Sequence, residues 1–417
     1  MNPLERKGLF GLASLYAFRM IGLFMLLPVL SLYAGQYTGS TTILVGVALG
    51  IYGLTQGIFQ IPLGFISDRI GRKPVIFAGM LIFFFGSMLA AMSDSMWGLI
   101  AGRALQGVGA VASTIMALLS DLTTEQSRTK AMAVIGGSIG VSFALSMVVG
   151  PILANLWGLA GLFWLTAILS VFGILILIFI VPSPAILSSN AESQALPEMF
   201  SKLLKDKELL RLNFGIAVLH FAQMATWISV PLILEQGLNF SREGHWVIYL
   251  IVLGLSFICM LPFLIMAEIK QKIKSVFVGA ILLLAIGEIL LGSGLENKVI
   301  FLIGLFVFFM AFNLLEATLP SLVSKLAPAG GKGTAMGIYS TSQFLGAFLG
   351  GVSGGLVAHH FSHSGVFWLA ALLITIWAIF ALTMKKPLHL KTLTIQLTSK
   401  DILVADDYIN VVPGVCD

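Results

Sequence analysis

A few ionisable side chains lie inside long apolar stretches of this sequence, and these residues could carry chemistry. Glu316 and His220 are surrounded along the chain by apolar residues. A carboxyl group can bind and release a proton, and an imidazole titrates near physiological pH. Arg19 and Arg103 lie in comparable stretches, where an arginine needs a partner or water. Together these side chains suggest reversible protonation close to positive charge.

Residues at helical spacing from these four groups share their helix faces and extend the set. Ala110 also falls on the face of Arg103, at i+7. The candidates for a proton and substrate site are Arg19, Arg103, Gln106, His220, Gln223, Trp227, Asn313 and Glu316. A structural alternative stays open for two of them. Glu316 could be a buried acid bonded to Asn313 or Arg19, and His220 could serve packing.

The composition indicates what must position these groups. Only 10% of the 417 residues are charged and 58% are hydrophobic, with a mean hydropathy of +1.00. Soluble domains contain about 25% charged residues. The chain is therefore predicted to be an integral membrane protein, and a nucleic-acid-binding or secreted domain is excluded. The two cysteines, Cys259 and Cys416, provide no disulfide framework.

A bilayer core needs about 20 consecutive apolar residues in a helix. Twelve stretches qualify and are each predicted to form one transmembrane helix: 9–34, 43–66, 74–92, 97–119, 132–155, 162–181, 212–234, 246–267, 275–293, 299–323, 335–357 and 366–384. The polar segment 182–211 separates a six-helix bundle, 1–181, from a second one, 212–384, and 385–417 forms a tail. Within the linker, 197–211 is predicted to be an interfacial helix next to anionic lipid.

The distribution of Lys and Arg predicts the orientation. Of the 24 such residues, Arg242 and Lys298 lie on one side and Arg19 and Arg103 lie within the membrane, so the remaining 20 share the side of the amino terminus. Because cytoplasmic loops are enriched in Lys and Arg, both termini are predicted to be cytoplasmic.

The two halves repeat each other weakly. At an offset of 200 residues, Asp68 and Arg72 align with Glu268 and Lys272. Six helices per repeat give both halves the same orientation, which is a parallel repeat around a central site. The alternative is that two basic loops look alike only because both face the cytoplasm.

The loop after the second predicted helix combines an acid with several basic residues and glycines. The acid could cap a neighbouring helix amino end, and the glycines permit a tight turn. This segment resembles the loop 2–3 signature of the major facilitator superfamily. The matching positions are Gly64, Asp68, Arg69, Gly71, Arg72 and Lys73. The resemblance implies that Asp68 contacts the start of the eleventh helix at Gly333–Gly337 and that Arg72 pairs with Asp121.

The fifth stretch ends a glycine-rich run with Gly150 and Pro151, preceded by Gly137. This pattern is similar to the antiporter signature of the drug–proton branch of the family. The alternative is a small-residue packing interface with a proline kink. The resemblance places Arg19, Arg103, His220 and Glu316 around one cavity. It also implies that Glu288 is on a peripheral helix, where a group near the outer interface is expected.

The resemblance implies an all-α membrane protein of twelve helices in two six-helix pseudo-repeats, located in a bacterial inner membrane. We expect a monomeric, proton-coupled antiporter that exports small amphipathic or cationic molecules, with no enzymatic activity, cofactor, metal or nucleic-acid partner. No nucleotide-binding loop that could drive an ATP pump is found. The alternatives are an importer or facilitator of the same fold, or a non-transporting sensor or scaffold. The tail is expected to be a poorly ordered start of a ferredoxin-like domain.

Overall fold

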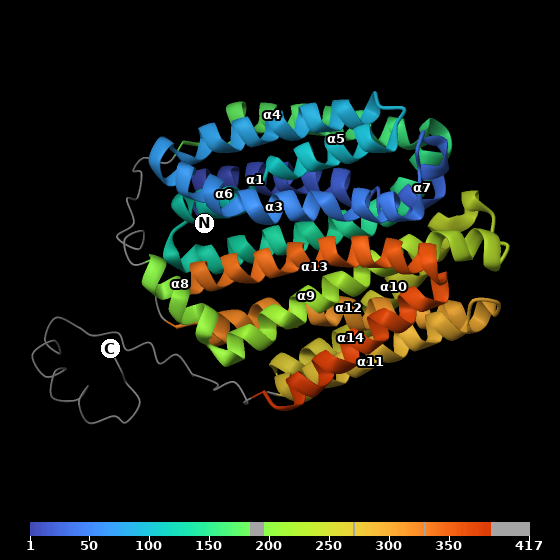
Figure 1. Ribbon diagram of the computed structural model, residues 1–417. Helices are drawn as coiled ribbons and strands as arrows, with labels where there is room; N and C mark the ends of the chain where they lie inside the picture. Colours follow the sequence, from blue (N-terminus) through green and yellow to red (C-terminus); the bar gives the residue numbers. More distant parts are fainter. Residues whose placement is uncertain (184–195, 270–271, 329–330, 385–417) are drawn as a thin grey trace, which may run out of the picture. The chain divides into compact units, whose positions relative to one another are not determined.

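The computed structural model describes residues 1–183, 196–269, 272–328 and 331–384, which are almost entirely helical (Figure 1). Ten of the described helices are long and apolar enough to cross a membrane. One of them, α7 (Glu125–Phe179), contains two predicted crossings that meet at Gly158, where φ is +67°. A further long helix, α13 (Lys332–His360), is less apolar because it is rich in glycine and hydroxyl residues. Counting both, the described residues contain the twelve predicted crossings.

The helix bounds agree closely with the hydrophobic stretches. The remaining long helices are α1 (Pro3–Phe24), α3 (Thr42–Ile70), α4 (Arg72–Ala91), α5 (Met96–Val108), α6 (Ala112–Leu122), α9 (Lys207–Leu232), α10 (His245–Glu268), α11 (Ile273–Ser293), α12 (Lys298–Leu326) and α14 (His363–Leu382). The short elements are α2 (Leu30–Tyr33), η1 (Ala34–Gln36), α8 (Leu196–Lys205), η3 (Ile233–Gly237) and η4 (Arg242–Gly244). The predicted tail, 385–417, lies outside the described residues.

The two halves pack their helices in the same pattern. Helix α1 packs on α7 as α9 packs on α13, and α3 packs on α5 as α10 packs on α12. Helix α4 contacts α5 and α7 just as α11 contacts α12 and α14. The contacts between halves are equivalent as well, because α3 packs on α13 and α10 packs on α7. This correspondence favours a duplication over two loops that are alike by chance.

Two predicted helices are interrupted. The first stretch, 9–34, is not one helix: α1 ends at Phe24, and the chain turns around Pro28 before α2. The fourth stretch, 97–119, breaks between α5 and α6 at Gly109, where ψ is +39°. A Cβ atom at Gly109 would lie 2.4 Å from the carbonyl oxygen of Gly79, so only glycine allows this approach of α5 to α4. Mean hydropathy does not register such breaks, because the residues remain apolar.

The linker also differs from its prediction as one helix over 197–211. Helix α8 ends at Lys205, and α9 begins at Lys207. The Asp206 side chain accepts hydrogen bonds from the backbone N–H groups of Glu208 and Leu209, at 2.8 and 3.0 Å. This is an N-cap, and it starts the seventh crossing a turn earlier than the apolar stretch does. Leu203 is buried, while Lys202 and Lys205 are exposed.

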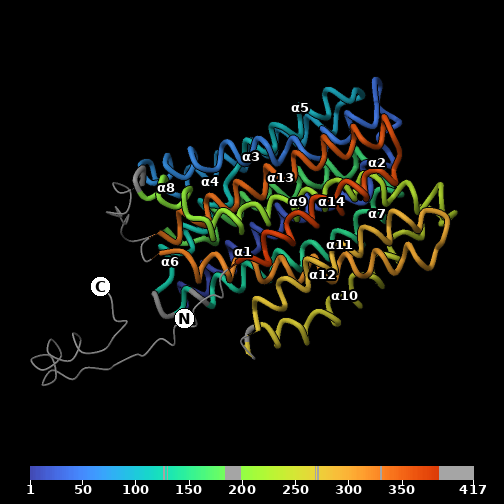
Figure 2. Tube along the Cα trace, turned by 60° about the horizontal axis from the view of Figure 1, so that its bottom comes forward, coloured from blue at the N-terminus to red at the C-terminus, as the bar shows by residue number. Residues whose placement is uncertain are grey.

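Helices α3 and α13 bring the two halves together and diverge along their length; both views place them side by side (Figures 1 and 2). A Cβ atom at Gly46 would lie 2.1 Å from the carbonyl oxygen of Gly351. At Gly57 the nearest atom of α13 would be 3.5 Å away, and at Gly64 no atom of α13 lies within 4 Å. We call the end that carries the amino terminus, the α3–α4 turn and α8 the basic end. The halves are therefore tightly packed at the opposite end and separate toward the basic end.

A polar contact also joins the halves at the opposite end. The Arg242 side chain donates two hydrogen bonds to the Glu235 carboxylate, at 2.9 and 3.0 Å. Its guanidinium carbon lies 4.8 Å from the centre of the Tyr33 ring, which belongs to the first half. The Tyr33 hydroxyl in turn donates to Asn155 Oδ1 at 2.5 Å. This chain of contacts reinforces the closure of that end.

Candidate functional site

Two buried arginines and a tyrosine form the polar centre of the first half. Arg19 on α1 is 1% exposed and donates to Gln56 Oε1 on α3 at 2.9 Å. It also reaches the carbonyl oxygen of Gly109 at 3.4 Å, which the break between α5 and α6 presents to it. The guanidinium carbons of Arg19 and Arg103 lie 5.9 and 5.0 Å from the centre of the Tyr52 ring. The ring thus takes part in cation–π contact with both arginines.

Arg103 is bound by groups of its own half. It donates to the carbonyl oxygen of Ala48 at 3.2 Å and to Gln106 Oε1 at 2.9 Å. Gln106 in turn donates to Ser87 on α4 at 2.8 Å. The predicted shared face of Arg103 and Gln106 is therefore present, while Ala110 falls outside the helix. Neither central arginine has a carboxylate partner within the described residues.

We expect Arg103→Lys to destabilise the first half by about 1.5–3 kcal/mol, the contribution of hydrogen bonds to a charged group. A lysine cannot reproduce the planar fork that binds both the Ala48 carbonyl and Gln106. The measurement is the thermal unfolding midpoint of the purified protein in detergent. Arg128→Lys, at an exposed position, is the control and should leave the midpoint unchanged. Equal midpoints for the two variants would contradict this structural role.

A polar triad lies in the second half, formed by His220 on α9, Glu316 on α12 and Gln343 on α13. The Glu316 side chain is 40% exposed, but its Oε2 atom is buried and has no hydrogen-bond partner within the described residues. Gln343 Nε2 lies 2.8 Å from His220 Nε2 and 3.5 Å from Glu316 Oε1. His220 Nε2 and Glu316 Oε2 are 3.8 Å apart. A protonatable carboxyl group and an imidazole therefore share one amide partner.

The amide defines the state of the histidine. With the Gln343 amide in the orientation seen here, its nitrogen faces the ring and donates, and His220 Nε2 accepts. The imidazole is then neutral, with its proton on Nδ1. Sequence reasoning missed Gln343, although a glutamine isolated in an apolar helix is a detectable signal. Gln56 and Tyr52 were also missed, because their roles depend on which helices pack together.

The other predicted residues of the second half have different neighbours. Asn313 Nδ2 donates to Ser256 Oγ on α10 at 3.4 Å, so it does not bind Glu316 as the structural alternative required. The Trp227 ring packs against Tyr249 and Phe309, with centroids 5.4 and 5.8 Å apart. Gln223 is buried. Among the predicted residues of the second half, the contacts within the described residues therefore bring Glu316 and His220 together, 3.8 Å apart.

The expectation for Glu288 is wrong. It was placed near the outer interface of a peripheral helix, but its side chain is fully buried between α11 and α9. Thr226 Oγ1 donates to its Oε1 at 2.8 Å, and its Oε2 has no partner within the described residues. Helix α11 packs mainly on α12 and α14, and the acid lies on its buried side, where it reaches Thr226 of α9.

The α3–α4 turn contains the signature residues. Gly71 has a φ of +99°, which a side chain would strain. Arg72 Nε lies 3.3 Å from Asp121 Oδ2 at the end of α6, the pair that the resemblance implied. Arg72 also forms an ion pair with Asp68. Lys73 Nζ donates to the carbonyl oxygen of Val181 at 2.7 Å, and Arg69 is exposed.

Asp68 is not in contact with α13. Its side chain is 42% exposed, and a Cβ atom at Gly333 or Gly337 would meet no atom within 4 Å. This absence is consistent with the separation of α3 and α13 at the basic end. The predicted contact between Asp68 and the start of α13 is therefore open in this conformation.

The glycine run of α7 is also loosely packed toward the basic end and tightly packed toward the opposite end. A Cβ atom at Gly137 would meet open space, whereas one at Gly150 would lie 2.7 Å from the carbonyl oxygen of Met25. Pro151 follows inside the helix. The packing interpretation therefore holds for Gly150 and not for Gly137, which lies nearer the basic end.

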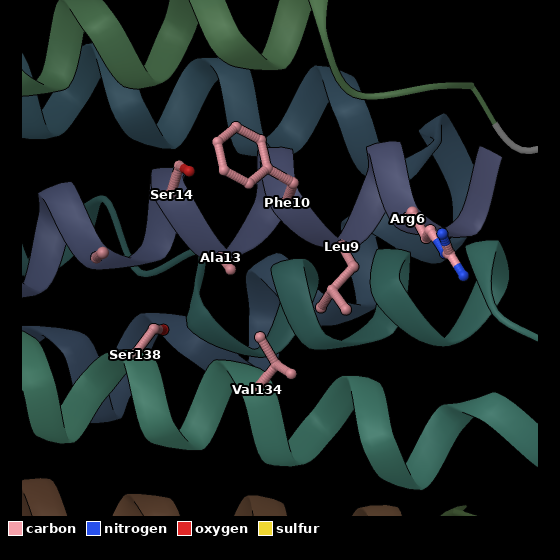
Figure 3. Close-up of a pocket in the computed structure, with 8 residues that line it drawn as sticks. Arg6, Leu9, Phe10, Ala13, Ser14, Val134 and Ser138 are labelled. Carbon is pink, nitrogen blue, oxygen red and sulfur yellow. The ribbon is translucent and has the colours of Figure 1, made fainter. Parts of the chain in front are cut away.

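A groove of about 350 Å³ lies between α1 and α7 near the basic end (Figure 3). Figure 3 shows Leu9 and Ala13 directed toward Val134 and Ser138, with Arg6 at one end. None of the central charged residues lines this groove. It is a largely apolar surface that is separate from the triad.

Comparisons with known proteins agree with this architecture. The sequence model of the Major Facilitator Superfamily matches residues 12–351 and 272–400. The chain is 49% identical over 397 residues to the inner membrane transport protein YajR of Escherichia coli strain K12, covering 95% of this chain and 87% of YajR. It is 32% identical over 165 residues to the class B tetracycline resistance protein of Escherichia coli, covering 38% and 40% of the two chains. A bacterial homologue of the human lysosomal transporter Spinster, solved in an inward-facing and occupied conformation, has the same fold, with a TM-score of 0.76 at 13% identity and coverage of 93% and 98%.

Proposed function

Because this chain belongs to the Major Facilitator Superfamily and is a membrane transporter, we propose that it is a proton-coupled antiporter that exports small amphipathic or cationic compounds. The observation that carries the proposal is the partly exposed Glu316, hydrogen-bonded to a neutral amide and 3.8 Å from the imidazole of His220. It has no cation to hold it permanently ionised among the described residues. Such a carboxyl group can exchange a proton during a transport cycle.

The orientation follows from the basic residues. If the basic end faces the cytoplasm, as the distribution of Lys and Arg favours, this conformation is open inward and closed outward. Protonation and deprotonation of Glu316 would then occur on different sides of the membrane as α3 and α13 separate at alternate ends. Uptake of a proton from outside and release inside would drive export.

The charge of the site favours a cationic or amphipathic substrate. A deprotonated Glu316 attracts a cation, and the apolar residues around it on α12 can contact the apolar part of an amphipathic compound. Protonation of the carboxyl group removes that attraction and favours release of the cation. The partial similarity to a tetracycline resistance protein supports a drug-like compound as substrate.

We expect Asp68→Asn to weaken the closed state of the basic end. In the proposed outward-open conformation, Asp68 interacts with the positive amino end of α13, a contact of about 0.3–1 kcal/mol. The measurement is the reactivity of single cysteines on α3 and α13 at that end, in a variant that lacks Cys259 and Cys416. The exposed Asp94→Asn, at the other end of the bundle, is the control. Unchanged cysteine reactivity together with unchanged transport would rule out this contact.

The direct test of the function is flux in proteoliposomes with an imposed pH gradient, measured for a panel of cationic, neutral and anionic compounds. We expect uphill accumulation of a cationic or amphipathic compound on the side of higher proton concentration. Accumulation on the side of lower proton concentration would indicate a symporter. Flux that only equalises concentrations would indicate a facilitator, and absence of flux would support the sensor or scaffold alternative.

A further inference from the structure

Gln343 connects the triad to the contact between the two halves. It lies on α13, the helix of the second half that packs along α3 of the first half. Two residues earlier on the same helix, Thr341 Oγ1 accepts a hydrogen bond from Gln60 Nε2 on α3 at 3.3 Å. Successive helical residues are about 100° apart, so Thr341 and Gln343 point to nearly opposite sides of α13. One side contacts α3, and the other contacts Glu316 and His220.

The contact with α3 lies where the two helices begin to diverge. The next residue, Phe344, has its carbonyl oxygen 2.9 Å from a Cβ atom placed at Gly53 and its Cβ atom 3.5 Å from one placed at Gly57. Beyond this level toward the basic end, Gly337 and Gly333 face open space. A small rotation or shift of α13 at residues 341–344 therefore changes the separation of the halves at the basic end.

The Gln343 amide can satisfy only certain protonation states of its neighbours. With Glu316 ionised and His220 neutral, the two N–H groups donate to Glu316 Oε1 and to His220 Nε2. When Glu316 binds a proton from water, it becomes a weaker acceptor, and the bond from the amide loses its charge assistance. If the proton is on His220 Nε2, that nitrogen becomes a donor, and the amide must turn its oxygen toward the ring. A proton on Glu316 thus weakens one hydrogen bond of the Gln343 side chain, and a proton on His220 Nε2 requires the amide to turn.

Few other titratable groups face this amide. Helix α9 contributes His220, α12 contributes Glu316, and α13 itself contributes Tyr339, which is close enough to Glu316 to interact with its charge. The Tyr339 hydroxyl has no hydrogen-bond partner within the described residues. Helix α3 contributes the neutral Gln60. The arginines Arg19 and Arg103 bind groups of their own half.

We propose that Gln343 is a positioning residue that couples the protonation of Glu316 to the movement of α13 against α3. This proposal rests on the proposed function, because it takes Glu316 as the proton carrier. In the ionised state, Gln343 holds α13 toward α9 and α12. Protonation releases this hold, so that α13 can move relative to α3 at the basic end in either direction of the cycle.

The experiment compares single variants by the distance between spin labels at Lys130 on α7 and Ser324 on α12, both exposed at the basic end. The distance distribution is recorded as a function of pH in nanodiscs, in a background without Cys259 and Cys416. Gln343→Met keeps the length of the side chain and removes its hydrogen bonds. Ser342→Ala is the matched control, because Ser342 bonds only to Ile338 of its own helix. Thr341→Val removes the bond to Gln60 without touching the triad.

We expect pH to shift the populations in the unmodified protein and in Ser342→Ala. In Gln343→Met, the ratio of populations should change with pH about tenfold less, which corresponds to the loss of one hydrogen bond to a charged group. Thr341→Val should change the ratio at every pH and keep its pH response. A merely structural role of Gln343 would alter stability or the ratio at all pH values while leaving the pH response intact, and that result would overturn the proposal.

Glu316→Gln, recorded in parallel, separates this inference from the proposed function. If both Glu316→Gln and Gln343→Met lose the pH response, the coupling through Gln343 is supported. If only Glu316→Gln loses it, the proton carrier stands and the role of Gln343 is refuted. If Glu316→Gln retains the response, Glu316 is not the carrier, and the proposed coupling is refuted with it.

Discussion

Glu316→Gln is expected to abolish uphill transport driven by a pH gradient while retaining downhill exchange of substrate. The substitution preserves the shape of the side chain and a hydrogen-bond acceptor for Gln343, but it removes the group that binds the proton. Transport then no longer depends on the proton gradient, although the helices can still move. The measurement is accumulation of substrate in proteoliposomes with and without a pH gradient, next to exchange of labelled for unlabelled substrate.

Two further variants make this result specific. His220→Ala should shift the pH profile of transport less severely, because it leaves the proton-binding carboxyl group of Glu316 in place and removes only its neighbour at 3.8 Å. Glu288→Gln is the matched control, because it removes a buried acid of the same half that is separate from the triad. Normal uphill transport by Glu316→Gln would show that the carrier lies elsewhere, with His220 or Asp68 as the next candidates.

Gly46→Ala is expected to shift the conformational equilibrium away from the state described here. The added methyl carbon would lie 2.1 Å from the carbonyl oxygen of Gly351, a backbone atom that cannot move without displacing α13. Overpacking of this kind costs about 1–3 kcal/mol, which is about 5- to 150-fold in a population ratio. The opposite end should therefore open more often, as measured between spin labels at Gln36 and Ser362, both exposed at that end.

Gly337→Ala tests whether any substitution on this helix pair has the same effect. A Cβ atom at Gly337 meets no neighbour within 4 Å in this conformation, so the variant should not increase opening of the opposite end. Thermal unfolding of both variants shows whether the alanine at position 46 destabilises the whole fold instead. A population ratio that is identical in Gly46→Ala and in the unmodified protein would contradict the tight packing of α3 and α13.

The sequence predicts the twelve crossings well because each is recorded locally, in about 20 apolar residues. It does not predict the break at Gly109, since that break depends on the approach of Gly79 from a neighbouring helix. It identifies Arg19, His220 and Glu316 because a charged or titratable residue is conspicuous in an apolar stretch. It does not identify their partners, Gln56 and Gln343, because the pairing is decided by packing between distant segments.

Glu288 also shows that packing between helices cannot be predicted from the sequence. Its place on a peripheral helix was inferred from the family, but the family does not specify which face of the helix an acid occupies. The buried bond to Thr226 is a property of this packing. By contrast, the pair of Arg72 with Asp121 was implied by the resemblance, and the structure contains it.

Proton movement driven by substrate is the most direct test of proton-coupled antiport. Proteoliposomes are loaded with a transported compound and a pH-sensitive dye and are then diluted into compound-free buffer with the membrane potential clamped. We expect outward movement of the compound to draw protons into the lumen and acidify it, and Glu316→Gln should show no acidification. Outward movement of the compound with no change in luminal pH in the unmodified protein would contradict the account.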